Sequence, residues 1–163
     1  MAANRQLVPV LVLAAFLACI AEDASPAARE DSEPDLLARI ARETDSIKKA
    51  KYQIRLSRVK LLQAMDACEK GEIESSQQLL QVYSEQVKNA WATLQETGRP
   101  AHKKPQGFKE LDIALREDSR YLEDLKRRFS FMDREPVEKV AEEVGKIRDE
   151  VLRALFPPVE SRK

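Results

Sequence analysis

The sequence predicts an all-α protein: an antiparallel up-down four-helix bundle behind an N-terminal export signal. Four stretches repeat apolar residues at alternating spacings of three and four, which places them on one face of a helix. Charged residues make up 34% of the 163-residue chain, and it contains only 4 glycines, a composition typical of surface-rich helices. The connections between the stretches are short, so successive helices are expected to reverse direction.

Residues 1–21 are expected to be a targeting segment. Arg5 is their one charged residue, and the uncharged apolar run over 7–18 is too short to span a bilayer comfortably. Ala21 is a suitable residue for signal-peptide cleavage. The segment therefore predicts an exported protein, periplasmic, secreted or lipid-anchored in a bacterial envelope.

A second processing site is consistent with the same segment. Leu17, Ala18 and Cys19 resemble the bacterial lipoprotein pattern. That resemblance implies a lipoprotein signal over 1–18, lipidation of Cys19 and attachment of the chain to a membrane. Ordinary cleavage after Ala21 and lipidation of Cys19 both stay open at this point.

The remaining chain is divided by composition. Residues 22–34 have the polar content of a flexible linker, the bundle is expected over 35–157, and a short tail over 158–163 begins within the pair Pro157 and Pro158. Ser32 and Pro34 are typical of a helix start. The first helix, 35–70, ends at Gly71, a residue that commonly closes helices.

The first helix is unusually long for this bundle. Over 35–70 it would measure roughly 54 Å, against about 39 Å for the second helix over 72–97. It therefore either overhangs its partner or breaks near Thr44–Ser46, where polar side chains can cap a new helix. The overhang presents three apolar residues that need burial or a partner: Leu36, Leu37 and Ile40.

The third and fourth helices follow a loop that contains two prolines and two glycines, 98–107. The third helix is expected over about 106–130, and the fourth follows Pro136 and ends before Pro157. The four predicted core faces are Ile47, Ala50, Ile54, Ser57, Leu61, Ala64 or Met65, and Cys68; Ile73, Ser76, Leu80, Tyr83, Val87, Ala90 and Leu94; Phe108, Leu111, Leu115, Leu122, Leu125 and Phe129; and Val137, Val140, Val144, Ile147, Val151, and Ala154 or Leu155.

The residues for catalysis are few. A single histidine, His102, excludes a multi-histidine metal site within one subunit, and no cysteine pair has zinc-binding spacing. The acidic residues are expected beside the apolar faces, not on them. We therefore predict no catalytic residue, no metal site, no cofactor and no small-molecule substrate. A small enzyme or metal protein that depends on His102 is the weakest alternative.

Two basic clusters are candidate binding sites. Lys48, Lys51, Arg55 and Arg58 recur at helical spacing beside the first core face, where they suit either an anion-binding face or pairing with the acidic residues Glu110, Glu117 and Asp124 of the third helix. Arg99, His102, Lys103, Lys104 and Lys109 surround the long loop, and loops often carry binding residues.

The overall charge excludes a general electrostatic attraction to nucleic acid. The chain has 28 Lys+Arg and 28 Asp+Glu; without Arg5 of the leader this becomes 27 against 28, or −1.

We therefore expect a non-enzymatic interaction module that binds a protein partner, or itself, through Leu36, Leu37 and Ile40, with basic residues steering the encounter. Trp91, at the edge of its core face, is a further interface candidate. The alternative is an anion-binding or membrane-surface module that uses the basic clusters at 48–60 and 99–109.

Overall fold

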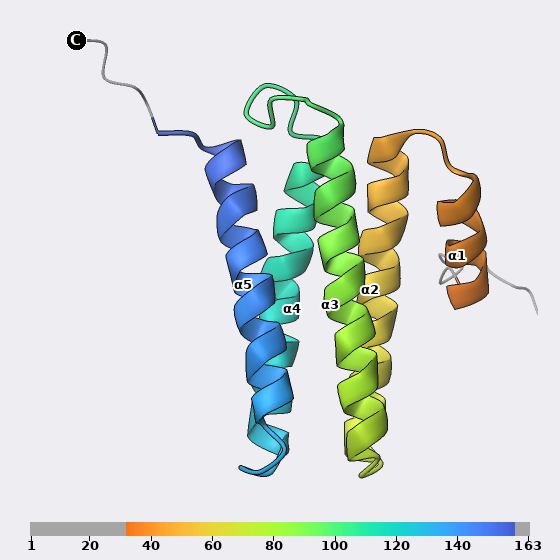
Figure 1. Ribbon diagram of the computed structural model, residues 1–163, viewed down its shortest axis with the longest axis vertical. Coiled ribbons are helices and arrows are strands. Elements are labelled where there is room, and N and C mark those ends of the chain that lie inside the picture. Colours follow the sequence, from red (N-terminus) through yellow and green to blue (C-terminus); the bar gives the residue numbers. More distant parts are fainter. Residues whose placement is uncertain (1–31, 159–163) are drawn as a thin grey trace, which may run out of the picture. The chain divides into compact units, whose positions relative to one another are not determined.

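The computed structural model describes residues 32–158, and these residues are all-helical, with no strand among them. Five helices follow one another: α1 (Glu33–Arg42), α2 (Ser46–Glu69), α3 (Ile73–Glu96), α4 (Phe108–Arg128) and α5 (Glu135–Leu155) (Figure 1). The predicted all-α class is confirmed, with one helix more than expected. The targeting segment 1–21, with Cys19, lies outside the described residues.

The additional helix exists because the long first helix expected over 35–70 is divided. An extended link, 43–45, separates α1 from α2, so the chain breaks at the position near Thr44–Ser46 that the polar residues indicated. The Asp45 carboxylate caps α2 by accepting a hydrogen bond from the Lys48 amide at 3.0 Å. This cap satisfies an amide that continuous helix would otherwise satisfy, and so it stabilises the break.

The turn between α2 and α3 depends on Gly71. Its φ of +78° lies in the left-handed region that side chains disfavour. The Glu72 amide donates to the Ala67 carbonyl at 2.9 Å, and the Gly71 amide donates to the Cys68 carbonyl at 3.1 Å. These bonds close the C-terminus of α2, as the glycine predicted.

The main core is one hydrophobic cluster to which α2, α3, α4 and α5 all contribute. The apolar residues of all four predicted faces are buried in this cluster or packed against it, which confirms the helical periodicity as the signal for the core. Cys68 is a free, partly buried cysteine at its edge. Leu36 and Leu56 are also buried, but they lie outside the main cluster.

The contacts between helices explain these two separate residues. α2 packs most extensively against α3, and α4 packs against α5; the two pairs meet through α2 with α4 and α3 with α5. α3 and α4 share only a small contact, so they are not the close neighbours that their order in the chain indicated. Among the described helices α1 contacts α2 alone, and Figure 1 shows it beside that helix.

Candidate functional site

The first basic cluster, on the flank of α2, contacts carboxylates of α4. The Lys51 Nζ lies 2.6 Å from Glu110 Oε1, and Arg58 Nη2 lies 2.9 Å from Glu117 Oε2. Members of each pair are 59 positions apart in the chain. These are the contacts expected if the charges flanking the core pair between helices. Exposed pairs of this kind contribute about 0–1 kcal/mol each, so they orient helices more than they stabilise them.

Two other cations of α2, Lys60 and Arg55, also have neighbours within the chain. Lys60 Nζ lies 2.6 Å from Glu33 Oε1 of α1. The guanidinium of Arg55 lies 5.9 Å from the ring centroid of Tyr52. Lys48 is exposed. The flank of α2 therefore uses most of its positive charge to hold its own helices, which leaves little for an external anion.

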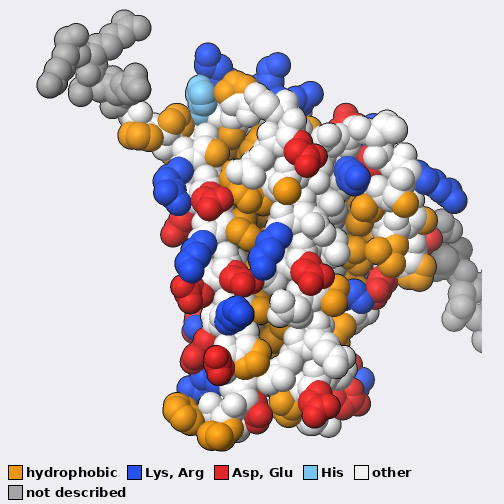
Figure 2. Space-filling view, viewed as in Figure 1, with side chains coloured by type: hydrophobic (Ala, Val, Ile, Leu, Met, Phe, Trp, Pro, Cys, Tyr) orange, Lys and Arg blue, Asp and Glu red, His pale blue; other side chains and the backbone are white. Residues whose placement is uncertain are grey.

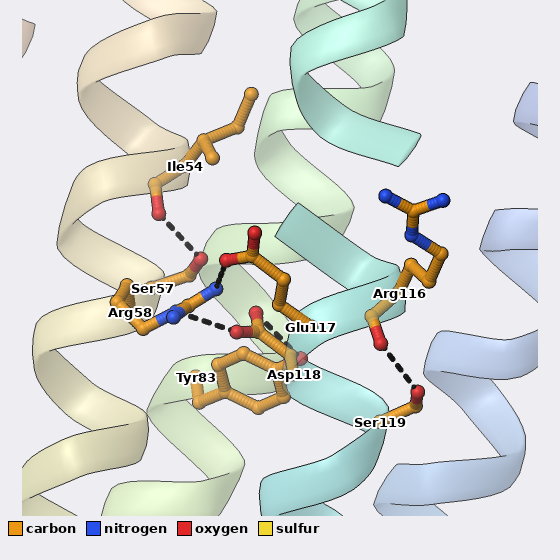
Figure 3. Close-up of polar contacts among 8 residues, drawn as sticks. All are labelled: Ile54, Ser57, Arg58, Tyr83, Arg116, Glu117, Asp118 and Ser119. Atoms are coloured by element: carbon orange, nitrogen blue, oxygen red, sulfur yellow. Dashed lines mark hydrogen bonds and ion pairs between the residues drawn. The ribbon is translucent and has the colours of Figure 1, made fainter. Parts of the chain in front are cut away.

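A buried polar cluster continues this flank into the core, where it joins three helices (Figure 3). Arg58 Nε of α2 lies 2.6 Å from Asp118 Oδ1 of α4. Tyr83 Oη of α3 donates a hydrogen bond to the second oxygen, Asp118 Oδ2, at 3.2 Å. Asp118 and Tyr83 are both 0% exposed. Tyr121 covers the outer side, its ring centroid 5.4 Å from the Arg58 guanidinium carbon.

Burial is the largest influence on the pKa values of the three residues in this cluster. Loss of solvent raises the pKa of Asp118 to about 6, while Arg58 and the Tyr83 hydroxyl hold it below the value that burial alone would give. Burial, together with the Asp118 charge, raises the pKa of Tyr83. Burial lowers the pKa of Arg58, but Asp118 and Glu117 outweigh that effect and raise it. At neutral pH the cluster is therefore an ion pair with a neutral tyrosine beside it.

The prediction that the acidic residues all lie beside the core faces is wrong at Asp118. Asp118 occupies the core position between Leu115 and Leu122, where the apolar repeat skips one place. That gap was the available signal, because a helix that faces the core continuously must also bury the skipped residue. Asp118 contacts both Arg58 and Tyr83, so this buried polar cluster specifies how α2, α3 and α4 meet.

The second basic cluster lies on the loop between α3 and α4, which is held firmly to the core. Ala101 is 4% exposed and Phe108 is 3% exposed, and both belong to the main cluster. The amides of Lys103 and Lys104 donate to the Pro100 carbonyl, each at 3.0 Å. The loop is thus pinned by apolar residues at both ends and turned by its own backbone between them.

Gly107 fixes the end of this loop. Its φ is +87°, and a Cβ placed there would lie 2.5 Å from Leu94 Cδ2. Its amide donates to Glu110 Oε2 at 2.6 Å, and Glu110 is the residue that also binds Lys51. Backbone conformation, close packing and a charged hydrogen bond together position the start of α4.

The charged side chains of this loop, and that of Lys109 at the start of α4, are exposed and carry no negative charge. Residues 97–109 contain no acidic residue. Arg99, His102, Lys103, Lys104 and Lys109 are all exposed. Within 32–158 no carboxylate forms an ion pair with Lys103, Lys104 or Lys109. Figure 2 shows lysine, arginine and histidine side chains gathered at this end of the helices.

The three apolar residues of α1 differ in exposure. Leu36 is 0% exposed and Leu37 is 49% exposed, while Ile40 is partly buried. Because α1 packs on α2, Leu36 is covered by the chain itself. A surface that used all three residues would require α1 to leave α2.

Trp91 also lies inside the fold. It is 8% exposed, its Nε1 donates to Glu150 Oε2 at 2.8 Å, and its ring meets Phe108 edge to face with centroids 6.0 Å apart. These contacts join α3, α4 and α5 just below the basic loop. Trp91 therefore packs inside the bundle, near the loop between α3 and α4.

Residues 32–158 hold no group of three or more His, Cys, Asp or Glu side chains placed to bind a metal ion. No helix in this range combines the length and the apolar character that a membrane span needs. Comparisons with protein-family models, curated proteins and solved structures find no match to the chain.

Proposed function

We propose that the protein is an exported, non-enzymatic interaction module of a bacterial envelope, and that it binds an anionic partner through the basic loop 98–109. The observation that supports this most is the contrast between the two basic clusters. Lys51 and Arg58 are paired within the chain. Lys103 and Lys104 project from a firmly held loop, and Lys109 from the first turn of α4, without a carboxylate partner among the described residues. A fixed loop loses little conformational entropy when it binds.

The interface predicted on Leu36, Leu37 and Ile40 has weaker support, because Leu36 is fully buried against α2. Self-association through this face would need α1 to detach first. The alternative of a His102-dependent enzyme stays a prediction, and His102→Ala tests it. If the variant keeps every activity and the metal content of the wild type, this alternative is excluded.

Export is proposed from the leader alone. Arg5 and the apolar run over 7–18 support it, and cleavage after Ala21 and lipidation of Cys19 predict different mature masses. Mass spectrometry of the protein purified from its host separates the two, because lipidation adds acyl chains to a residue that ordinary cleavage removes.

We also propose that the four long helices alternate in direction. Contacts between α2 and α4 join residues with a constant separation of 59, as in Lys51–Glu110 and Arg58–Glu117, and a constant separation is what parallel helices produce. Between α2 and α3, Ser76 Oγ donates to the Ala64 carbonyl across a turn of three residues, which supports an antiparallel pair.

A soluble polyanion tests the proposed function. Fluorescence anisotropy should detect binding of labelled polyglutamate to the purified protein at low salt and its loss at high salt, since screening weakens exposed charges. Lys103→Gln/Lys104→Gln should weaken binding at least tenfold. Arg116→Gln/Arg120→Gln is the matched control, because it removes the same charge from exposed positions on α4. Equal loss in both variants would show a response to net charge only and contradict the proposal.

A further inference from the structure

We infer that the basic end of the bundle docks on an anionic lipid surface, with Phe156 inserting beside the cations. This inference rests on the proposed function and names the partner of the same loop. Phe156 is 73% exposed and directly follows α5. The α5 C-terminus and the loop between α3 and α4 lie at the same end of the helices in Figure 1.

Contacts beneath the surface fix this proximity. Trp91 of α3 binds Glu150 of α5 and packs on Phe108 of α4. From Trp91 and Glu150, α3 and α5 each continue about one to two further turns toward this end, α3 to the loop with Arg99 and α5 to Phe156. The aromatic side chain and the basic loop are therefore parts of one end surface.

The combination of groups favours a lipid surface over an acidic protein. The headgroup region of an anionic bilayer attracts lysine and arginine and also accepts aromatic side chains at the boundary with the acyl chains. An acidic protein face would neutralise the lysines but would leave Phe156 without a matching environment. Pro157 and Pro158 are exposed next to it and extend the apolar part of this surface.

The opposite end of the bundle is the internal control. Phe131 and Met132 are each 85% exposed in the turn between α4 and α5. The neighbouring cations are paired, Arg127 with Asp124 and Arg128 with Glu69. Arg134 of the same turn donates to the Phe129 carbonyl, and its chain neighbours Asp133 and Glu135 are acidic. This end therefore combines exposed aromatic surface with mixed charge, so it should bind an anionic bilayer less well than the basic end. α5, about 31 Å long, separates the two ends.

Vesicle sedimentation tests the inference with the full chain as its host exports and processes it. We expect binding to phosphatidylcholine vesicles containing 30% phosphatidylglycerol to exceed binding to pure phosphatidylcholine at least tenfold at 50 mM salt, and the difference to disappear at 500 mM. An N-terminal lipid would strengthen binding to both compositions equally, so the difference reports on the basic end alone.

Four variants assign the effect to residues. Lys103→Gln/Lys104→Gln should weaken binding to anionic vesicles about 25-fold, from roughly fivefold for each cation at the surface. Phe156→Ser should weaken it about tenfold through lost apolar burial. Phe131→Ser and Arg116→Gln/Arg120→Gln should leave it unchanged. Circular dichroism confirms that each variant remains folded.

The outcomes separate this inference from the function beneath it. Equal binding to neutral and anionic vesicles, or equal losses in Phe156→Ser and Phe131→Ser, would overturn the lipid docking. If polyglutamate still binds through Lys103 and Lys104 in that case, the anionic partner is a protein or another soluble polymer and the proposed function stands. If neither probe binds, both fail.

Discussion

Replacing Arg58 by methionine should leave a buried carboxylate without its cation. Arg58 Nε lies 2.6 Å from Asp118 Oδ1, and Asp118 is 0% exposed. Methionine keeps much of the aliphatic volume that packs between α2 and α4 but removes the charge. Among the described residues, the Tyr83 hydroxyl would then be the one remaining hydrogen-bond partner of Asp118.

Breaking a buried ion pair from one side costs about 3–5 kcal/mol. The Arg58 side chain is 27% exposed, so water replaces part of its interaction and the loss should lie at the lower end. We expect the free energy of unfolding at pH 7 to fall by about 3 kcal/mol. For a domain of this size that corresponds to a fall in Tm of roughly 12 °C.

The pH dependence identifies the cause. The folded-state pKa of Asp118 is about 6, above its unfolded value near 3.9, so its contribution to stability is present below pH 4 and is lost as pH rises through 6. Without Arg58 that pKa rises further, and the variant loses more stability than the wild type between pH 5 and 7. The difference in unfolding free energy between the wild type and the variant should therefore be about 1 kcal/mol smaller at pH 5 than at pH 7.

Urea unfolding followed by circular dichroism at pH 5 and 7 measures both quantities. Adding Asp118→Asn to Arg58→Met should recover most of the loss at pH 7, because the amide is neutral and still accepts from Tyr83. Arg116→Met, on the exposed face of α4, should change stability by less than about 0.5 kcal/mol. A deficit that is equal at both pH values, or a double variant as unstable as the single one, would refute the reasoning.

Further expectations concern the backbone and the core. Gly107→Ala should destabilise the protein by about 2 kcal/mol, because the new methyl would meet Leu94 in a left-handed conformation, whereas Gly145→Ala, in a helix with no atom within 4 Å, should stabilise it by about 0.5–1 kcal/mol in thermal unfolding. Leu80→Asp and Ile147→Asp should each abolish the cooperative transition seen by circular dichroism, because both positions are buried and the new carboxylate has no partner there. Normal stability in either aspartate variant would show that the helix faces are misassigned.

The buried faces could be predicted because burial follows helical period. Leu80 and Val87 recur with the spacing of one helix face on α3, as do Val140 and Ile147 on α5, and the structure buries all four. Asp118 could not be recognised by polarity, since an isolated carboxylate is normally exposed. Its burial depends on Arg58, which lies 60 residues earlier and meets it only when α2 and α4 pack together.

The candidate site shows the same division between local and long-range information. The positive charge of Lys103 and Lys104 follows from the residue type, and their exposure follows from a loop rich in proline and glycine. The pairing of Lys51 with Glu110, which separates one basic cluster from the other, requires the packing of two helices. The apolar period also could not decide whether the helix continues through Asp45, because a capped break and a continuous helix differ little in free energy.

The attachment of α1 sets the order in which the protein opens. Among the described helices α1 packs against α2 alone, with Leu36 buried and Glu33 paired with Lys60, and no residue of α1 belongs to the main cluster. Releasing it exposes Leu36 and Leu56 but leaves the other helices packed. We expect its amides to exchange with solvent through a sub-global opening, at a lower free energy than amides of α3, and proteases to cut first at the extended link 43–45.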